Sequence, residues 1–141
     1  MPDLQTIAYV STAIRLLSVA ELETLLVTAR DLNLQTSVTG VLLYSGGNFM
    51  QCFEGPPPAV HETYERIRAS HQHTDIIELL NEPLDVRGFA DWQMGFSQVT
   101  RSELLTLSHA RWARLNAEVR GTAPTSSGLA LLQNFWQHAR K

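Results

Sequence analysis

Three polar residues, Tyr9, Asn33 and Gln51, are candidates for chemistry, because apolar packing alone does not account for side chains of these types at these positions. Gln51 is the middle residue of the run 49–53 (FMQCF), on the face that it shares with two phenylalanines. An amide left unpaired there costs about 1–3 kcal/mol, so we expect something polar above it. Alternation places Tyr9 on a buried face as well, where its hydroxyl needs a partner. A tyrosine ring can be oxidised and a glutamine amide exchanges donor for acceptor when it reverses, so this pair of residue types suits a switch.

Each of these residues also has a purely structural explanation. Gln51 suits an edge or surface position, Tyr9 suits a core aromatic with its hydroxyl at the rim, and Asn33 suits a helix C-cap. Taken singly, none of the three indicates a function.

The elements that must position them follow from periodicity and turn signals. Five runs have the β-branched, aromatic or alternating pattern of strands: 4–11, 37–44, 48–54, 75–82 and 90–99. One helix is expected over about 19–32, after the capping box of Ser18 and Glu21, and another over about 58–70, after a run of prolines. The order β-α-β-β-α-β-β predicts an α+β, ferredoxin-like sheet with two helices on one face.

After residue 100 the pattern is helical. Thr100 and Glu103 form a further capping box, and apolar residues recur at helical spacing on both sides of a polar linker over 120–128. These apolar stripes need a partner, and the uncovered face of the sheet is the nearest candidate, with self-association as the alternative. We therefore divide the chain into a domain over 1–100 and a C-terminal helical appendage over 101–141.

Composition narrows the class of partner. The 141-residue chain has a formal charge of −3 and scattered basic residues, which argues against nucleic acid. The N-terminus lacks the features of a signal peptide, and no stretch approaches the length of a transmembrane segment. The lone Cys52 favours a reducing compartment, and no Cys/His spacing indicates a metal site. We expect a cytoplasmic protein with no membrane, nucleic-acid or metal partner.

Five motifs together make the chain resemble the BLUF family of flavin-based light sensors. They are Tyr9-x-Ser11, Arg30-x-x-Asn33, the run 38–44 (VTGVLLY), the run 49–55 (FMQCFEG) and the run 92–96 (WQMGF). They stand in the family's order and at its spacing between Leu4 and Phe96. The fold that the resemblance implies is the one derived above.

The resemblance implies a noncovalently bound flavin between the two helices, usually FAD, with FMN or riboflavin left open. Leu26 and Ile67 would sandwich the ring, and Asn33 would hydrogen-bond its polar edge. Tyr9 and Gln51 would form a pair beside its N5 and C4 carbonyl. In the family, the excited flavin draws an electron and a proton from the tyrosine, and their return leaves the glutamine rearranged. The implied cofactor-binding set is Tyr9, Leu26, Arg30, Asn33, Phe49, Gln51, Arg66, Ile67, His73 and Met94.

Trp92 and Met94 are the expected transmitters of the signal, together with Ser11. Alternation puts Trp92 and Met94 on one face, although only one of them can lie against Gln51. The output is expected through a separate signalling protein or a homo-oligomer. The tail of the flavin is less defined, because the family's Asp-x-Arg-His segment is replaced by residues 70–73 (SHQH), in which only His73 matches.

Two other classes compete with this photoreceptor, which is not expected to be an enzyme. One is a flavin-free interaction or oligomerisation module of the same fold. The other is an acylphosphatase-type hydrolase using Arg15, although the glycine-rich phosphate cradle that it needs is missing. A nucleophilic pair of Cys52 and His61 is disfavoured, because alternation turns Cys52 away from Gln51 and the helices.

Overall fold

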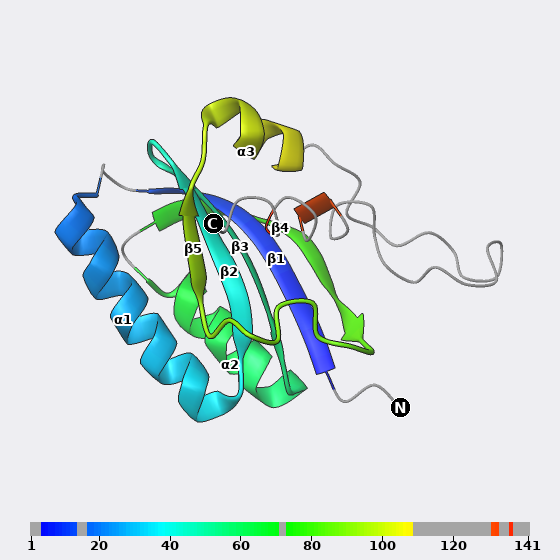
Figure 1. The fold of residues 1–141 in the computed structure, drawn as a ribbon. Coiled ribbons are helices and arrows are strands. Elements are labelled where there is room, and N and C mark those ends of the chain that lie inside the picture. The colour runs from blue at the N-terminus through cyan, green and yellow to red at the C-terminus, as the bar shows by residue number, and fades with distance from the viewer. Residues whose placement is uncertain (1–3, 14–16, 71–72, 109–130, 133–135, 137–141) are drawn as a thin grey trace, which may run out of the picture.

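The computed structural model describes residues 4–13, 17–70, 73–108, 131–132 and 136. A five-stranded sheet carries α1 and α2 on one face and α3 on the other (Figure 1). The strands are β1 (Leu4–Ala13), β2 (Thr39–Ser45), β3 (Asn48–Gly55), β4 (His73–Leu84) and β5 (Gly95–Gln98). The helices are α1 (Val19–Thr36), α2 (Pro57–Arg68) and α3 (Arg101–Ser108).

The strand order is β4-β1-β3-β2-β5, with β5 parallel to β2 and the other pairs antiparallel. This confirms the predicted α+β, ferredoxin-like arrangement. β1 and β3 are adjacent inner strands, and their register sets Tyr9 directly opposite Gln51. Both side chains therefore project from the same face of the sheet.

Local signals fix most of these elements. α1 begins at Ser18, whose Oγ accepts from the backbone N–H of Glu21 at 3.1 Å, while the Glu21 carboxylate accepts from the N–H of Ser18 at 2.8 Å. The β2–β3 hairpin turns on Gly46 and Gly47, both with positive φ, as the paired glycines predict. α1 runs four residues beyond its predicted end, because Ser37, at φ 63°, takes the C-cap position and Asn33 stays inside the helix.

The last strand is shorter than predicted, and this overturns one expectation. β5 begins only at Gly95, since the chain turns just before it: the N–H of Trp92 donates to the carbonyl of Phe89 at 3.0 Å. Residues 90–94 are not extended, so strict alternation does not hold there. Trp92 packs on the α3 face, whereas Met94 packs on the α1 face.

The α3 face of the sheet holds the larger apolar core. Leu104 and Leu107 of α3, with Leu132 and Trp136, pack against strand residues that include Met50 and Cys52. The expectation that C-terminal helical residues cover this face is thus confirmed for these four, while 109–130 lie outside the described residues. The boundary at residue 100 remains a prediction. Within the described part of the chain, no helix is long and apolar enough to cross a membrane.

Candidate functional site

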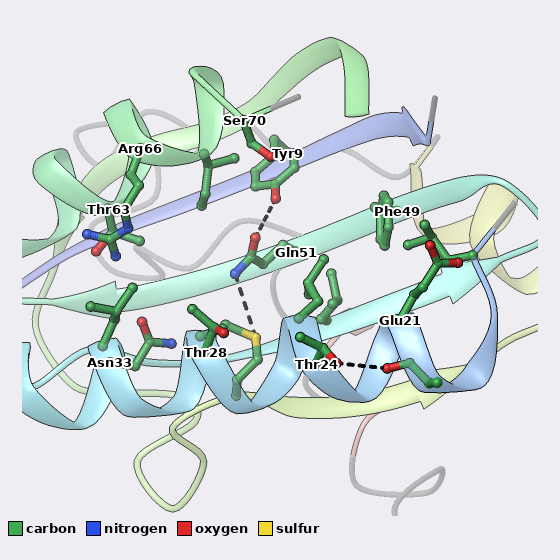
Figure 2. A pocket seen from close by; sticks show the side chains of 18 residues that line it. Tyr9, Glu21, Thr24, Thr28, Asn33, Phe49, Gln51, Thr63, Arg66 and Ser70 are labelled. Carbon is green, nitrogen blue, oxygen red and sulfur yellow. Dashed lines mark hydrogen bonds between the residues drawn. The ribbon is translucent and has the colours of Figure 1, made fainter. Parts of the chain in front are cut away.

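A line of hydrogen bonds joins three segments of the helix-covered face. The Tyr9 hydroxyl donates to Oε1 of Gln51, and Nε2 of Gln51 donates to Sδ of Met94 at 3.6 Å (Figure 2). The amide of Gln51 is therefore engaged at both ends, as its position in an apolar strand requires. Met94, and not Trp92, is the residue that lies against Gln51.

The environment of this line keeps the tyrosine protonated. Tyr9 is 2% exposed, and burial raises the pKa of its hydroxyl well above the ordinary range, with the neighbouring Tyr64 as a second cause. The two rings lie 6.1 Å apart between centroids. At neutral pH Tyr9 is therefore a hydrogen-bond donor that can act on Gln51 only through its neutral hydroxyl.

A cavity of about 600 Å³ lies between α1 and α2, above this line. Most of its lining surface is apolar, although the walls also carry polar side chains of both helices, and its floor is the sheet. Wall residues include Leu25, Ala29, Thr63, Arg66 and Ile67, and floor residues include Tyr9, Leu42, Phe49, Gln51 and Met94. Apolar walls with a few convergent polar groups suit a flat aromatic ligand with one polar edge.

Asn33 supplies one of these polar groups. It is 2% exposed, and its Nδ2 donates to the carbonyl of Gln93 at 2.5 Å. Its Oδ1 accepts no hydrogen bond from any residue that the structure describes. Asn33 therefore ties α1 to the segment before β5 and leaves an acceptor for an N–H group of a ligand.

The predicted wall residue Leu26 needs correction. Leu26 is 6% exposed. It packs between α1 and the sheet with Leu22 and Leu42, and it does not line the cavity. Each helical residue turns by about 100° from the one before it, so Leu25, one position earlier, points to the cavity instead. Leu25 on α1 and Ile67 on α2 are the opposed apolar side chains.

Three arginines near the site, of which Arg30 and Arg66 belong to the predicted set, lie in different places. Arg66 lines the cavity on α2. Arg30 does not line it: its exposed side chain donates from Nε to the carbonyl of Met94 at 2.9 Å. Arg68 lies over the ring of Tyr64, with its guanidinium 5.6 Å from the centroid. Arg66 is therefore the one of these three that a ligand in the cavity would meet.

The remaining predicted site residues also lie in different places. Phe49 lines the cavity, while Ser11 is buried in β1 opposite Phe49 in the register. Trp92 is edge-on to Trp136 on the α3 face, with ring centroids 5.3 Å apart. The side chain of His73 and the whole of Arg15 lie outside the described residues.

The alternative nucleophilic pair is not assembled. Cys52 is buried on the α3 face, and burial raises the pKa of its thiol to about 12. His61 is exposed on α2, which covers the opposite face. Cys52 is therefore a packed core residue, as expected.

Glu54 is a residue for which the sequence offers only a weak signal. It is 1% exposed and accepts hydrogen bonds from the Thr39 hydroxyl at 2.9 Å and from the N–H groups of Gly88 at 2.9 Å and Phe89 at 2.8 Å. Burial raises the pKa of its carboxyl, and these bonds, with Arg87 nearby, oppose that shift. Glu54 thus anchors the segment that brings Met94 to Gln51.

Fold and site together define a ferredoxin-like ligand-binding domain, in which a cavity lies over a tyrosine–glutamine pair. The family described as BLUF, sensors of blue-light using FAD, matches residues 4–95, which is more than half of the chain. The chain therefore belongs to the BLUF family and is a blue-light sensor domain that uses a flavin.

Relatives agree with this assignment. The chain is 38% identical over 92 residues to the photoactivated adenylate cyclase subunit beta of Euglena longa, covering 64% of this chain and 11% of the cyclase. It is 37% identical over 71 residues to the blue light- and temperature-regulated antirepressor BluF of Escherichia coli, covering 50% of this chain and 18% of that protein. The chain thus spans only a small part of these relatives, and their whole-protein activities are their own.

Solved structures lead to the same family. The dark state of BlrB, a BLUF protein, is 37% identical with a TM-score of 0.65, covering 77% of this chain and 80% of BlrB. A bacterial light-regulated adenylyl cyclase is 26% identical with a TM-score of 0.66, covering 97% of this chain but 35% of the cyclase. BlrB is thus matched over most of its length, whereas the cyclase is matched over about a third of its length.

Proposed function

We propose that this domain signals blue light by a reversal of Gln51 that Tyr9 drives. A flavin held between Leu25 and Ile67 supplies the absorption of blue light and an excited state that accepts an electron. FAD is the proposed form, on the family's own description. Asn33 would accept from the ring's N–H, and Arg66 is the candidate partner for a phosphate of the tail.

Tyr9 is the proposed electron and proton donor. Loss of an electron makes a phenol hydroxyl strongly acidic, and the hydrogen-bonded Oε1 of Gln51 is the acceptor in place to take the proton. Among the described residues, the other end of the amide is held only by the Met94 sulfur, a weak acceptor, so little opposes rotation or tautomerisation of Gln51. When the electron and proton return to Tyr9, Gln51 is left in the changed arrangement.

The observation that carries this proposal is the Tyr9–Gln51–Met94 line in the floor of the cavity. Met94 directly precedes β5, which leads to α3, so a change at Gln51 has a short covalent route to the opposite face. We propose that the output leaves by this route, to a separate signalling protein or through a change of homo-oligomer. The buried free thiol of Cys52 fits the proposed cytoplasmic location.

One absorption experiment tests the proposal. Purified protein should be yellow, and blue light should shift its flavin band to the red, with recovery in the dark. Gln51→Leu should keep the flavin and lose the shift. Gln93→Leu is the matched control, because the Gln93 side chain is exposed and only its backbone carbonyl is used.

Two results would each contradict a different part of the proposal. A colourless protein that takes up no added flavin would favour the flavin-free interaction module. A normal photocycle in Gln51→Leu would leave the flavin in place but remove Gln51 as the switch.

A further inference from the structure

The cavity contains one buried hydroxyl group that has no hydrogen-bond partner among the described residues. Thr63 lines the cavity from α2 and is 4% exposed. Its Oγ1 is buried and forms no hydrogen bond with any described residue. A buried hydroxyl in that state costs about 1–3 kcal/mol, so its retention needs an explanation.

Three other threonines in the helices satisfy their hydroxyls locally. Thr24, Thr36 and Thr106 each donate to the carbonyl four residues earlier, at 3.1, 2.8 and 2.9 Å respectively. That bond is the usual solution for a helical threonine. Thr63 does not make it, which leaves its hydroxyl available to a group outside the chain.

The position of Thr63 points to the polar edge of a ring. Thr63 and Ile67 are four residues apart on α2, so they share one helix face, and Ile67 is a wall of the cavity. Asn33 lies across the cavity on α1 from Thr63 and Arg66 (Figure 2). Thr63 thus lies at the same end of the cavity as Asn33, whereas Glu21 and Thr24 of α1 line the other end (Figure 2).

We propose that Thr63 is a ring-binding residue, whose hydroxyl donates a hydrogen bond to a carbonyl on the pyrimidine edge of the flavin. This rests on the proposed function, in which a flavin occupies the cavity. The pyrimidine edge carries an N–H flanked by two carbonyl groups. Asn33 keeps its Oδ1 acceptor and one N–H of Nδ2 for that edge, and Thr63 supplies a further donor, so the two side chains together are complementary to the N–H and the two carbonyl groups.

Recognition by Thr63 is therefore directed at the ring and not at the tail. Riboflavin, FMN and FAD share the ring and differ only beyond it. The contribution of Thr63 to affinity should be equal for all three flavins.

The test compares Thr63→Val, which keeps the shape and removes the hydroxyl, with Thr63→Ser, which keeps the hydroxyl. Thr106→Val is the matched control, since Thr106 is a helical threonine of α3 that does not line this cavity and already donates to Ser102. Apoprotein is titrated with riboflavin and with FAD. Thr63→Val should raise Kd for both by about tenfold, the size expected for one hydrogen bond, while Thr63→Ser and Thr106→Val stay near the wild-type value.

Two further readouts separate binding from a structural role. Thr63→Val should raise the melting temperature of the apoprotein, because an unsatisfied buried hydroxyl is gone, even though flavin affinity falls. It should also raise a carbonyl stretching frequency of the bound ring in the infrared spectrum, which a structural role for Thr63 would not change. If Thr63→Val fails to fold, Thr63→Ala against Thr63→Ser makes the same comparison.

Unchanged Kd values in Thr63→Val overturn the inference, and so does a loss confined to FAD, which would place the contact on the tail. These results differ from failure of the proposed function, in which the wild-type protein itself binds no flavin.

Discussion

Replacing Tyr9 by phenylalanine removes one hydroxyl and little else. The ring should keep its place, since it packs against Phe53 and Tyr64 with centroids 6.5 and 6.1 Å away. Gln51 is 7% exposed and loses the donor to its Oε1. A buried acceptor left unpaired costs about 1–3 kcal/mol. We expect the apoprotein to lose about 1–2 kcal/mol of unfolding free energy, or about 3–6 °C of melting temperature.

The light response should be affected far more than stability. Tyr9→Phe should bind flavin, because the walls of the cavity are unchanged, but show no red shift under blue light, because phenylalanine has no proton to give to Gln51. Urea denaturation of the apoprotein and absorption spectra of the flavin-loaded protein measure the two effects.

Tyr64→Phe is the control that isolates the hydrogen bond. Tyr64 adjoins Tyr9, and burial raises the pKa of its hydroxyl to about 12, but it does not bond to Gln51. Its variant should keep the photocycle. A normal red shift in Tyr9→Phe would refute the assignment, and loss of the shift in both variants would show that general repacking, not this bond, is responsible.

Further predictions concern which face of α1 lines the cavity and the buried carboxylate of Glu54. Leu26→Ala should lower the free energy of unfolding by about 2–5 kcal/mol and leave the ring walls in place, whereas Leu25→Glu should fold but bind flavin poorly; denaturation and flavin titration distinguish them. Burial raises the pKa of Glu54 in the folded chain, so the folded state binds more protons than the unfolded state as the pH falls toward the unfolded pKa. The wild type should therefore gain stability relative to Glu54→Gln between pH 7 and pH 5, as measured by urea denaturation; a relative loss would mean that the hydrogen bonds to Glu54 outweigh its burial.

The parts of the fold that were predictable have local signals. The capping box at Ser18, the glycine pair at 46–47 and the alternation of β1 and β3 each involve residues close together in the chain. The buried amide of Gln51 and the hydroxyl of Tyr9 also indicated polar partners, because an unpaired polar group in an apolar strand is costly.

The errors arose where tertiary contacts decide. α1 carries neighbouring apolar residues on two faces, so the choice of Leu25 or Leu26 as a cavity wall depends on how the helix rests on the sheet. Trp92 and Met94 lie on opposite faces of the sheet because a turn precedes β5, and side chains alternate between faces only along an extended backbone. Glu54 and its partners Gly88 and Phe89 are more than 30 residues apart in the sequence. Periodicity carries no information about contacts at that separation.

The central register of Tyr9 and Gln51 restricts how such a switch could work mechanically. β1 is paired on both edges, to β3 and β4, and β3 is paired on both edges, to β1 and β2. The backbone under the two residues is thus a stiff frame, and displacing it would break ladders on either side. Met94 stands outside any strand, with its carbonyl held by the long, exposed side chain of Arg30. Of the three residues in the line it has the most compliant support, so a displacement at Gln51 would be taken up first at Met94.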